Sequence, residues 1–179
     1  MTYIHSEEYK KKFDHISENN VLNDALYKNA VKLLSQNKNS DTEGVFIINS
    51  QNGKTILNKR GEKDALGVGL TDRDLRIIRN QSSIVGIHNH PTNLPPNGSD
   101  LTAAGYRKYD FGIIVTHDGR VFKYSVGNKP FVTQALDARI DKYKGKDYNL
   151  SVEDAYIKAL NEFRKEYNIS WLEVESENT

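Results

Sequence analysis

The hydrophobic positions of this chain follow a helical spacing near both ends and an extended spacing in the middle. From residue 6 to residue 35, apolar side chains recur every three or four positions, which predicts two helices broken near Asn19 and Asn20. The same spacing predicts two further helices over residues 130–144 and 152–167. Helical segments are therefore expected on either side of a central region with a different pattern.

Short runs rich in β-branched residues predict the strands of this central region. Two pairs of runs are separated by turn signals, Asn52-Gly53 in the first pair and Asp118-Gly119 in the second, so each pair is expected to form a hairpin. A single apolar run between the hairpins suits a central strand. The predicted strands cover residues 44–49, 54–58, 84–87, 111–116 and 120–125.

Two shorter helices are predicted by their capping residues. Thr71 followed by Asp74 resembles the start of a capping box, for a helix that runs through Arg79. Ser99 is expected to be the N-cap of a second helix that runs through Tyr106.

The remaining segments are less regular. Residues 59–69 are polar and contain several glycines, which predicts a loop. Alternation at Val121, Lys123 and Ser125 predicts one exposed face for the last of the five strands. Residues 170–174 fit either an additional edge strand or an unstructured tail.

This order of elements predicts an α/β (α+β) fold, in which a mixed sheet is flanked by helices. At 179 residues, the chain is long enough to bury a substantial core as one globular unit. We divide it into an N-terminal helical extension over residues 1–40, a core over 41–128 and a C-terminal helical extension over 129–179.

Composition narrows the candidate functions. With 25 basic and 24 acidic residues, the formal net charge is +1, so no global field favours nucleic acid or an anionic membrane. The absence of cysteine excludes disulfides, thiolate nucleophiles and every zinc site that contains Cys, including that of the zinc deaminases. No basic start is followed by an apolar stretch, and no long apolar run occurs, so a soluble, cytoplasmic protein is expected.

The strongest chemical signal follows the central strand. A period of two directs His88 and His90 to one face, while Asn89 points to the other. The proline-rich segment that follows forms a stiff loop, which can return Asp100 to the end of the strand. Two imidazoles and one carboxylate are a ligand set for a catalytic Zn²⁺, and they leave a fourth position for water.

A hydrolytic zinc site also needs a general base. Glu43 directly precedes the first strand, where its carboxylate could reach the mouth of a neighbouring strand. Asp41 and Glu62 fit the sequence less well as alternatives. A residue that merely carries a solvated carboxylate would show the same pattern, so the sequence alone does not place Glu43 beside the histidines.

These residues resemble the motif of the JAMM (MPN+, JAB1/MPN/Mov34) zinc metalloproteases, in the branch found in prokaryotes and phages. The resemblance rests on Glu43, the string His88-Asn89-His90-Pro91 and the segment from Asn97 to Asp100. It implies that His88, His90 and Asp100 bind one zinc ion and that Glu43 is the general acid/base. It also implies the three-layer MPN/JAB fold, related to that of cytidine deaminase, over residues 41–126.

The chain departs from the family motif at the position of a serine that helps to stabilise the oxyanion. Asn97 stands at this position, the loop after His90 is shorter than in many members, and Ser99 adjoins the aspartate instead. A side-chain amide can donate a hydrogen bond to an oxyanion, so either Asn97 or Ser99 could fill the role.

The resemblance therefore implies a zinc-dependent peptidase or isopeptidase that cleaves an amide bond in a protein or peptide, with ubiquitin-like proteins among the candidate substrates. One alternative is a non-catalytic MPN-type interaction module. Another is a nucleic-acid-associated role like that of RadC-type relatives, which the near-neutral charge disfavours.

Overall fold

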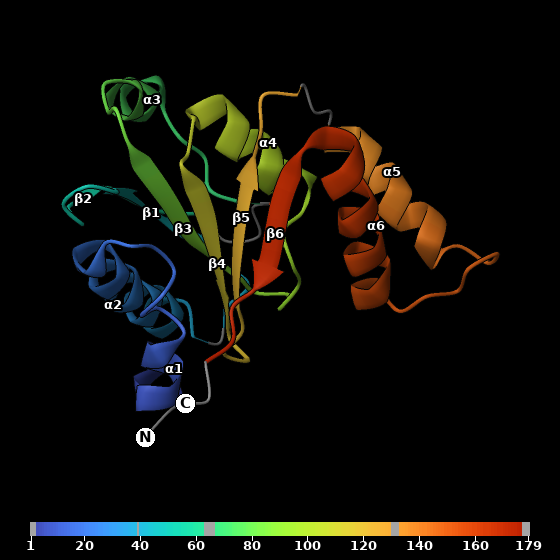
Figure 1. The fold of residues 1–179 in the computed structure, drawn as a ribbon, viewed down its shortest axis with the longest axis horizontal. Helices are drawn as coiled ribbons and strands as arrows, with labels where there is room; N and C mark the ends of the chain where they lie inside the picture. The colour runs from blue at the N-terminus through green and yellow to red at the C-terminus, as the bar shows by residue number, and fades with distance from the viewer. Residues whose placement is uncertain (1–2, 39, 63–66, 130–132, 177–179) are drawn as a thin grey trace.

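The computed structural model describes residues 3–38, 40–62, 67–129 and 133–176. Within them, a six-stranded mixed sheet is flanked by helices (Figure 1). The strands are β1 (Gly44–Asn49), β2 (Thr55–Arg60), β3 (Ile84–His90), β4 (Phe111–Thr116), β5 (Val121–Val126) and β6 (Ile169–Glu173). The helices are the 3-10 helix η1 (Tyr3–His5), α1 (Glu7–Lys11), α2 (Asn20–Gln36), α3 (Asp72–Arg79), α4 (Gly98–Arg107), α5 (Thr133–Lys144) and α6 (Val152–Tyr167).

Strand β3 lies near the centre of the sheet, whose strand order is β2-β1-β3-β4-β5-β6. It pairs with β1 in antiparallel and with β4 in parallel orientation, and the other neighbours are antiparallel. Because a parallel pair needs a crossover, α4 connects the end of β3 to the start of β4. The end of β3 and the first turn of α4 therefore meet at one edge of the sheet.

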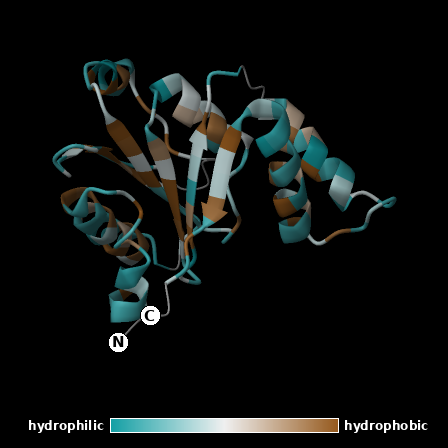
Figure 2. Ribbon diagram, viewed as in Figure 1, coloured by the Kyte–Doolittle hydropathy of each residue, from teal (hydrophilic) through white to brown (hydrophobic). Residues whose placement is uncertain are grey.

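Two apolar clusters fill the space on the two faces of the sheet. On one face, alternate residues of the central strands, such as Val85 and Ile87, pack against α1 and α2. On the other face, residues such as Ile114 and Phe122 pack against α4, α5 and α6. Figure 1 shows these helices on opposite sides of the sheet, and Figure 2 shows hydrophobic residues along the central strands and on parts of the helices. This double covering explains why the central strands are apolar without a strict alternation.

Two glycines on neighbouring strands make room for two tyrosine rings. Gly86 of β3 and Gly112 of β4 are direct partners in the register. A Cβ atom at Gly86 would lie 2.3 Å from Tyr109, and one at Gly112 would lie 2.2 Å from Tyr124. Any larger residue would displace these rings, so the glycine pair allows the tyrosines to lie flat against the sheet on the side of α4.

The predicted hairpins, central strand and four main helical regions are observed, with several corrections. The first N-terminal helix is only the short α1, and Phe13 lies beyond it in a turn, although it is buried. Strand β2 extends through Lys59 and Arg60, which were predicted as loop. Val121 does not belong to an exposed face, because it is fully buried against the cluster around α2.

Two predictions concern the C-terminal part. The tail forms the edge strand β6, which pairs with β5. The predicted helix start at Pro130 falls outside the described residues, and α5 is described from Thr133. No described helix combines the length and the apolar character that are needed to cross a membrane.

Candidate metal centre

Strand β3 ends with two histidine side chains on the same face, as its period of two predicted. The Nε2 atoms of His88 and His90 lie 3.1 Å apart, and the ring centroids lie 4.9 Å apart. His90 is 3% exposed, and His88 is the more accessible of the two. Because β3 is held between β1 and β4, the direction of both imidazoles is fixed by the sheet.

Asp100 reaches the same point from the first turn of α4. Its Oδ1 atom lies 3.0 Å from His88 Nε2, and its Oδ2 atom lies 3.2 Å from His90 Nε2. The carboxylate also accepts a hydrogen bond from the backbone N–H of Asn97, at 2.8 Å. This bond is half of a capping box, so the cap of α4 holds Asp100 in place.

The spacing of these donor atoms fits a zinc ion. Ligands about 2.0–2.1 Å from a tetrahedral Zn²⁺ stand roughly 3.3 Å from one another. The three closest separations among the candidate ligands, 3.0, 3.1 and 3.2 Å, are near this value. His88, His90 and Asp100 thus form a compact set of two imidazole nitrogen donors and one carboxylate, which is a composition that catalytic zinc sites use.

The orientation of His90 is set by the loop that follows it. Its Nδ1 atom lies 2.9 Å from the carbonyl oxygen of Leu94, and since a carbonyl only accepts, Nδ1 carries the proton. This arrangement leaves Nε2 free for a metal, and such a second hydrogen bond is usual for a metal-binding histidine.

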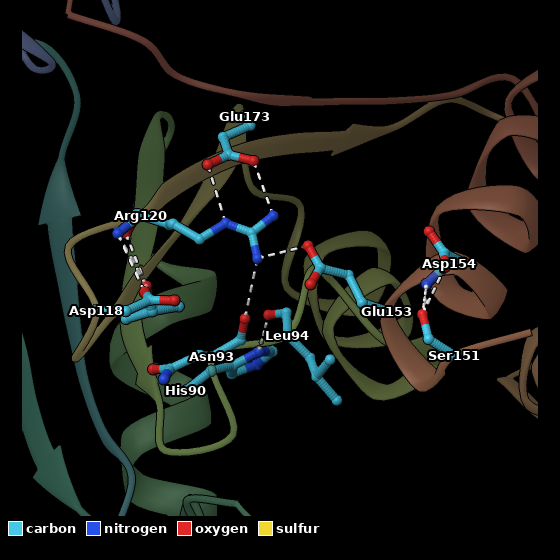
Figure 3. Close-up of polar contacts among 10 residues, drawn as sticks. His90, Asn93, Leu94, Asp118, Arg120, Ser151, Glu153, Asp154 and Glu173 are labelled. Carbon is cyan, nitrogen blue, oxygen red and sulfur yellow. Dashed lines mark hydrogen bonds and ion pairs between the residues drawn. The ribbon is translucent and has the colours of Figure 1, made fainter.

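Arg120 contacts the loop between His90 and Asp100 at Asn93, the residue before Leu94 (Figure 3). It donates to the carbonyl of Asn93 at 3.5 Å, forms a two-fold contact with Glu173 at 2.8 and 2.9 Å, and pairs with Glu153 at 2.7 Å. The backbone N–H of His117 donates to the side chain of Asn93. The loop between the ligands is therefore tied to β6, to α6 and to the turn after β4.

The charges of the triad stabilise one another in the metal-free protein. Burial lowers the pKa of His90, but the Asp100 carboxylate outweighs burial and raises it to about 9. Burial raises the pKa of Asp100, but the two histidines outweigh this effect, so the pKa lies well below its usual range. A cation is therefore favoured at this point, whether it is a proton or a metal ion.

Glu43 lines a cleft of about 590 Å³ together with all three candidate ligands. It is half-buried, at the entry to β1. Of the alternatives weighed from the sequence, neither Asp41 nor Glu62 is among the residues that line this cleft.

Asn97 and Ser99 also line the cleft, but their structural roles differ from the prediction. Ser99 is not the N-cap of α4, because the helix begins at Gly98 and Asn97 is the cap. The side-chain oxygen of Asn97 accepts hydrogen bonds from the N–H groups of Ser99 and Asp100, at 2.8 and 3.1 Å. This earlier start places Asp100 at the third helical position, where a carboxylate can complete a capping box.

Sequence patterns did not single out several other residues of the cleft. These include Arg107, Tyr109, Tyr124, Asp137 and Tyr156. Arg107 lies seven positions after Asp100 on α4, and this spacing was the only available signal that the two share a helix face. The tyrosines carry no comparable signal, since they come from three separate places in the chain: Tyr109 follows α4, Tyr124 belongs to β5 and Tyr156 to α6.

The chain matches no model of a known protein family, no curated protein and no solved structure. Its function is therefore inferred from the cleft and its residues.

Proposed function

We propose that the protein is a zinc-dependent hydrolase of amide bonds, a metallopeptidase or isopeptidase of the JAMM type. The observation that supports it best is the convergence of His88, His90 and Asp100, at the spacing of zinc ligands, in a cleft that Glu43 also lines. When bound there, zinc would supply a positive centre that polarises a carbonyl group and lowers the pKa of a coordinated water molecule.

Glu43 is the proposed general base and acid. Its carboxylate would accept a proton from the attacking water and deliver it to the leaving amine. It directly precedes β1, the strand that pairs with the histidine strand. In this pair, Val45 is the register partner of His88. Glu43 is thus two positions from a residue that lies beside a candidate ligand.

Asn97 is the proposed donor to the oxyanion, with Ser99 as the alternative. The side-chain oxygen of Asn97 is engaged by the helix cap, which fixes the amide plane. Its Nδ2 group makes no hydrogen bond within the described part of the chain, so it is available to a substrate carbonyl. Since this geometry does not need a hydroxyl group, an asparagine can stand where the family motif has serine.

The MPN/JAB fold and a protein or peptide substrate are part of the same proposal. The hairpin, the histidine strand, the crossover helix and the second hairpin follow one another in the order that the resemblance implies. Helices on both faces of the sheet give the three layers. The peptide substrate is what the resemblance implies, and a cleft of about 590 Å³ is large enough to hold a short segment of it.

Metal content provides the first test. Protein purified without added zinc should contain one zinc ion per chain, and His88→Ala and Asp100→Ala should each lose it. Thr92→Ala, which lines the cleft without a metal-binding side chain, should retain it. Wild-type protein that neither contains nor takes up stoichiometric zinc would refute the proposal.

Hydrolysis provides the second test, with a panel of peptide and isopeptide substrates. Glu43→Gln should keep the zinc ion and lose cleavage, whereas Asp41→Asn, on an exposed neighbour outside the cleft, should retain both. A zinc-loaded wild type that cleaves no substrate would favour the alternative of a non-catalytic interaction module.

A further inference from the structure

The cleft contains one fixed positive side chain. Among its described lining residues, Arg107 is the only lysine or arginine, whereas the carboxylates of Glu43, Asp100 and Asp137 all contribute to the lining. No carboxylate lies within ion-pair distance of Arg107 in the described parts of the chain. A guanidinium group that faces a cleft without an acidic partner is a candidate to bind one from a ligand.

Arg107 is held in place by a buried phenol. Its Nη1 atom donates to the hydroxyl group of Tyr109 at 3.0 Å, and its guanidinium carbon lies 6.0 Å from the centre of the same ring. Tyr109 is only 8% exposed and lies against Gly86, so it cannot move freely. One edge of the guanidinium is thus occupied by a neutral partner, and the other N–H groups remain available.

The distance from Arg107 to the metal centre follows from the helix. Asp100 and Arg107 are seven residues apart on α4, so they share a face and are separated by about 10 Å along the axis. Helical side chains lean toward the N-terminus, so the guanidinium can lie closer to the metal centre than this backbone separation. An extended peptide advances about 3.3 Å per residue, so the separation corresponds to no more than about three residues.

Tyr124 lines the same cleft as the two charged groups. Burial raises the pKa of Tyr124, and the charges of Asp100, Arg107 and Glu43 all act on its hydroxyl group. The metal centre, the candidate base and the arginine therefore all lie in one cleft, close enough to act on the same hydroxyl group.

We propose that Arg107 binds a carboxylate of the substrate, within about three residues of the scissile bond. The carboxylate belongs either to an acidic side chain or to a free C-terminus. This specificity rests on the proposed hydrolase function, because the position of the carboxylate is defined relative to the bond that is cleaved. The surrounding carboxylates repel an acidic group elsewhere in the cleft, so a single cation would also fix the register of the substrate.

Equilibrium binding tests this proposal without turnover. Zinc-loaded Glu43→Gln protein is titrated with fluorescein-labelled alanine-glycine peptides that carry one glutamate or one glutamine at each position in turn. A second series has the same sequence with a free or an amidated C-terminus. We expect an acidic peptide to bind about tenfold more tightly than its neutral counterpart, as a charge-assisted hydrogen bond would give.

Variants of Arg107 and a matched control complete the experiment. Arg107→Gln in the same background should abolish the preference, and Arg107→Lys should restore part of it. Arg79→Gln is the control, because Arg79 also donates to a tyrosine hydroxyl group, that of Tyr106, but neither residue lines the cleft. If Arg107→Gln removes the preference for glutamate over glutamine, the carboxylate belongs to an acidic side chain. If it removes the preference for the free over the amidated C-terminus, the carboxylate is the C-terminal one.

The outcomes separate this inference from the proposed function. Equal binding of acidic and neutral peptides with Arg107 present, or a preference that persists in Arg107→Gln, would overturn the inference. A preference that depends on Arg107 in a zinc-loaded wild type that cleaves no substrate would favour the non-catalytic interaction module and leave the carboxylate site intact. In an active protein, Arg107→Gln should raise KM for the acidic peptide and leave kcat nearly unchanged.

Discussion

Asn89 faces away from the candidate metal ligands, yet its side chain holds the segment that carries Glu43. Its Oδ1 atom accepts from the backbone N–H of Gly44 at 2.8 Å, and its Nδ2 group donates to the carbonyl of Thr42 at 3.1 Å. Both residues flank Glu43 in the chain. Asn37, the C-cap residue of α2, donates to the same Oδ1 atom at 3.0 Å. The Asn89 side chain is fully buried. The residue between the two histidines therefore links their strand to the proposed base.

Replacing Asn89 with alanine should loosen Glu43 while the metal ligands stay in place. The change leaves the Gly44 N–H and the Thr42 carbonyl buried without partners, which should lower the free energy of unfolding by about 3 kcal/mol. We expect zinc content to stay at the wild-type level and kcat to fall, with a shift in the acidic limb of its pH profile. Urea unfolding, metal analysis and kinetics measure these three quantities.

The matched control for this prediction is Asn29→Ala on α2. The Asn29 side chain donates to the carbonyl of Ala25, one turn earlier in the same helix, so its loss should affect neither kcat nor its pH profile. If Asn89→Ala lowered stability but left the pH profile of kcat unchanged, the link to Glu43 would be wrong and the amide would be purely structural.

The pKa of His90 predicts how stability changes with pH once the metal is removed. Burial lowers this pKa, but Asp100 outweighs burial and raises it to about 9, above the value of about 6.5 for an unfolded chain. Between these values the folded protein binds more protons than the unfolded chain. In a chelator, the free energy of unfolding should therefore fall as pH rises from about 6.5 to 9.

Two comparisons check this pH dependence by chemical denaturation. Asp100→Asn removes the carboxylate and should remove most of the fall. In zinc-loaded protein the metal displaces the proton from His90, so zinc affinity should rise over the same pH range. A flat profile for the wild type in chelator would show that the imidazole and the carboxylate are not paired as the geometry indicates.

At the scale of single residues, the sequence correctly predicted the side-chain directions that depend on local periodicity. The alternation of a strand placed His88 and His90 on one face, and the structure confirms this arrangement. Which residue caps α4 was predicted wrongly, because Asn97 and Ser99 are both good N-caps and the choice depends on the path of the loop. Arg107 was missed, because its place in the cleft depends on how Tyr109 packs over the sheet.

Among the elements, the hairpins and long helices were predictable, and their exact ends were not. Strand β2 runs two residues further than the pattern indicated because β1 offers it backbone partners through Gly44. The sequence did not decide between an edge strand and an unstructured tail at the position of β6. Five residues with mixed polarity become a strand only when β5 is beside them. Pairing with a neighbouring strand determines whether such segments are extended, and a single sequence does not show which strands are neighbours.

The ion-pair cluster of Arg120 joins elements that are distant in sequence. Arg120→Met should lower the free energy of unfolding by about 1–2 kcal/mol, because it removes a two-fold contact with Glu173 and leaves Glu153 unpaired. It should also release the loop that carries Asn93 and Leu94, which would lower zinc affinity. Denaturation, zinc titration and amide hydrogen exchange across residues 92–97 measure these effects.

Arg139→Met is the matched control for this prediction. Arg139 pairs with Glu162 and Glu166 in the contact between α5 and α6, away from the metal-site loop. We expect a comparable loss of stability with unchanged zinc affinity and exchange at residues 92–97. Equal effects of the two variants on zinc affinity would mean that the Arg120 cluster acts only through general stability.

At the scale of the whole molecule, the sheet separates the two apolar clusters and contributes residues to both. Its last strand belongs to the C-terminal segment, and α6 places Phe163 and Leu160 in the same cluster as Phe122 and Tyr124 of β5. Tyr124 in turn lies against Gly112 of β4, in edge-to-face contact with His88 at 6.4 Å. The segment that we separated as an extension over residues 129–179 thus contributes to the packing behind the candidate metal centre.

A chain that ends at residue 128 should therefore not reach the native state. It would expose the edge of β5 and the apolar face that α5, α6 and β6 cover, and an uncovered edge with apolar residues promotes association. The full chain should unfold in one cooperative transition, because elements of both clusters share the same strands. Circular dichroism, size-exclusion chromatography and zinc binding measure the comparison. A monomeric 1–128 fragment with a cooperative transition and wild-type zinc affinity would show that the core is complete without the C-terminal segment, and that β6 and α6 only add to its surface.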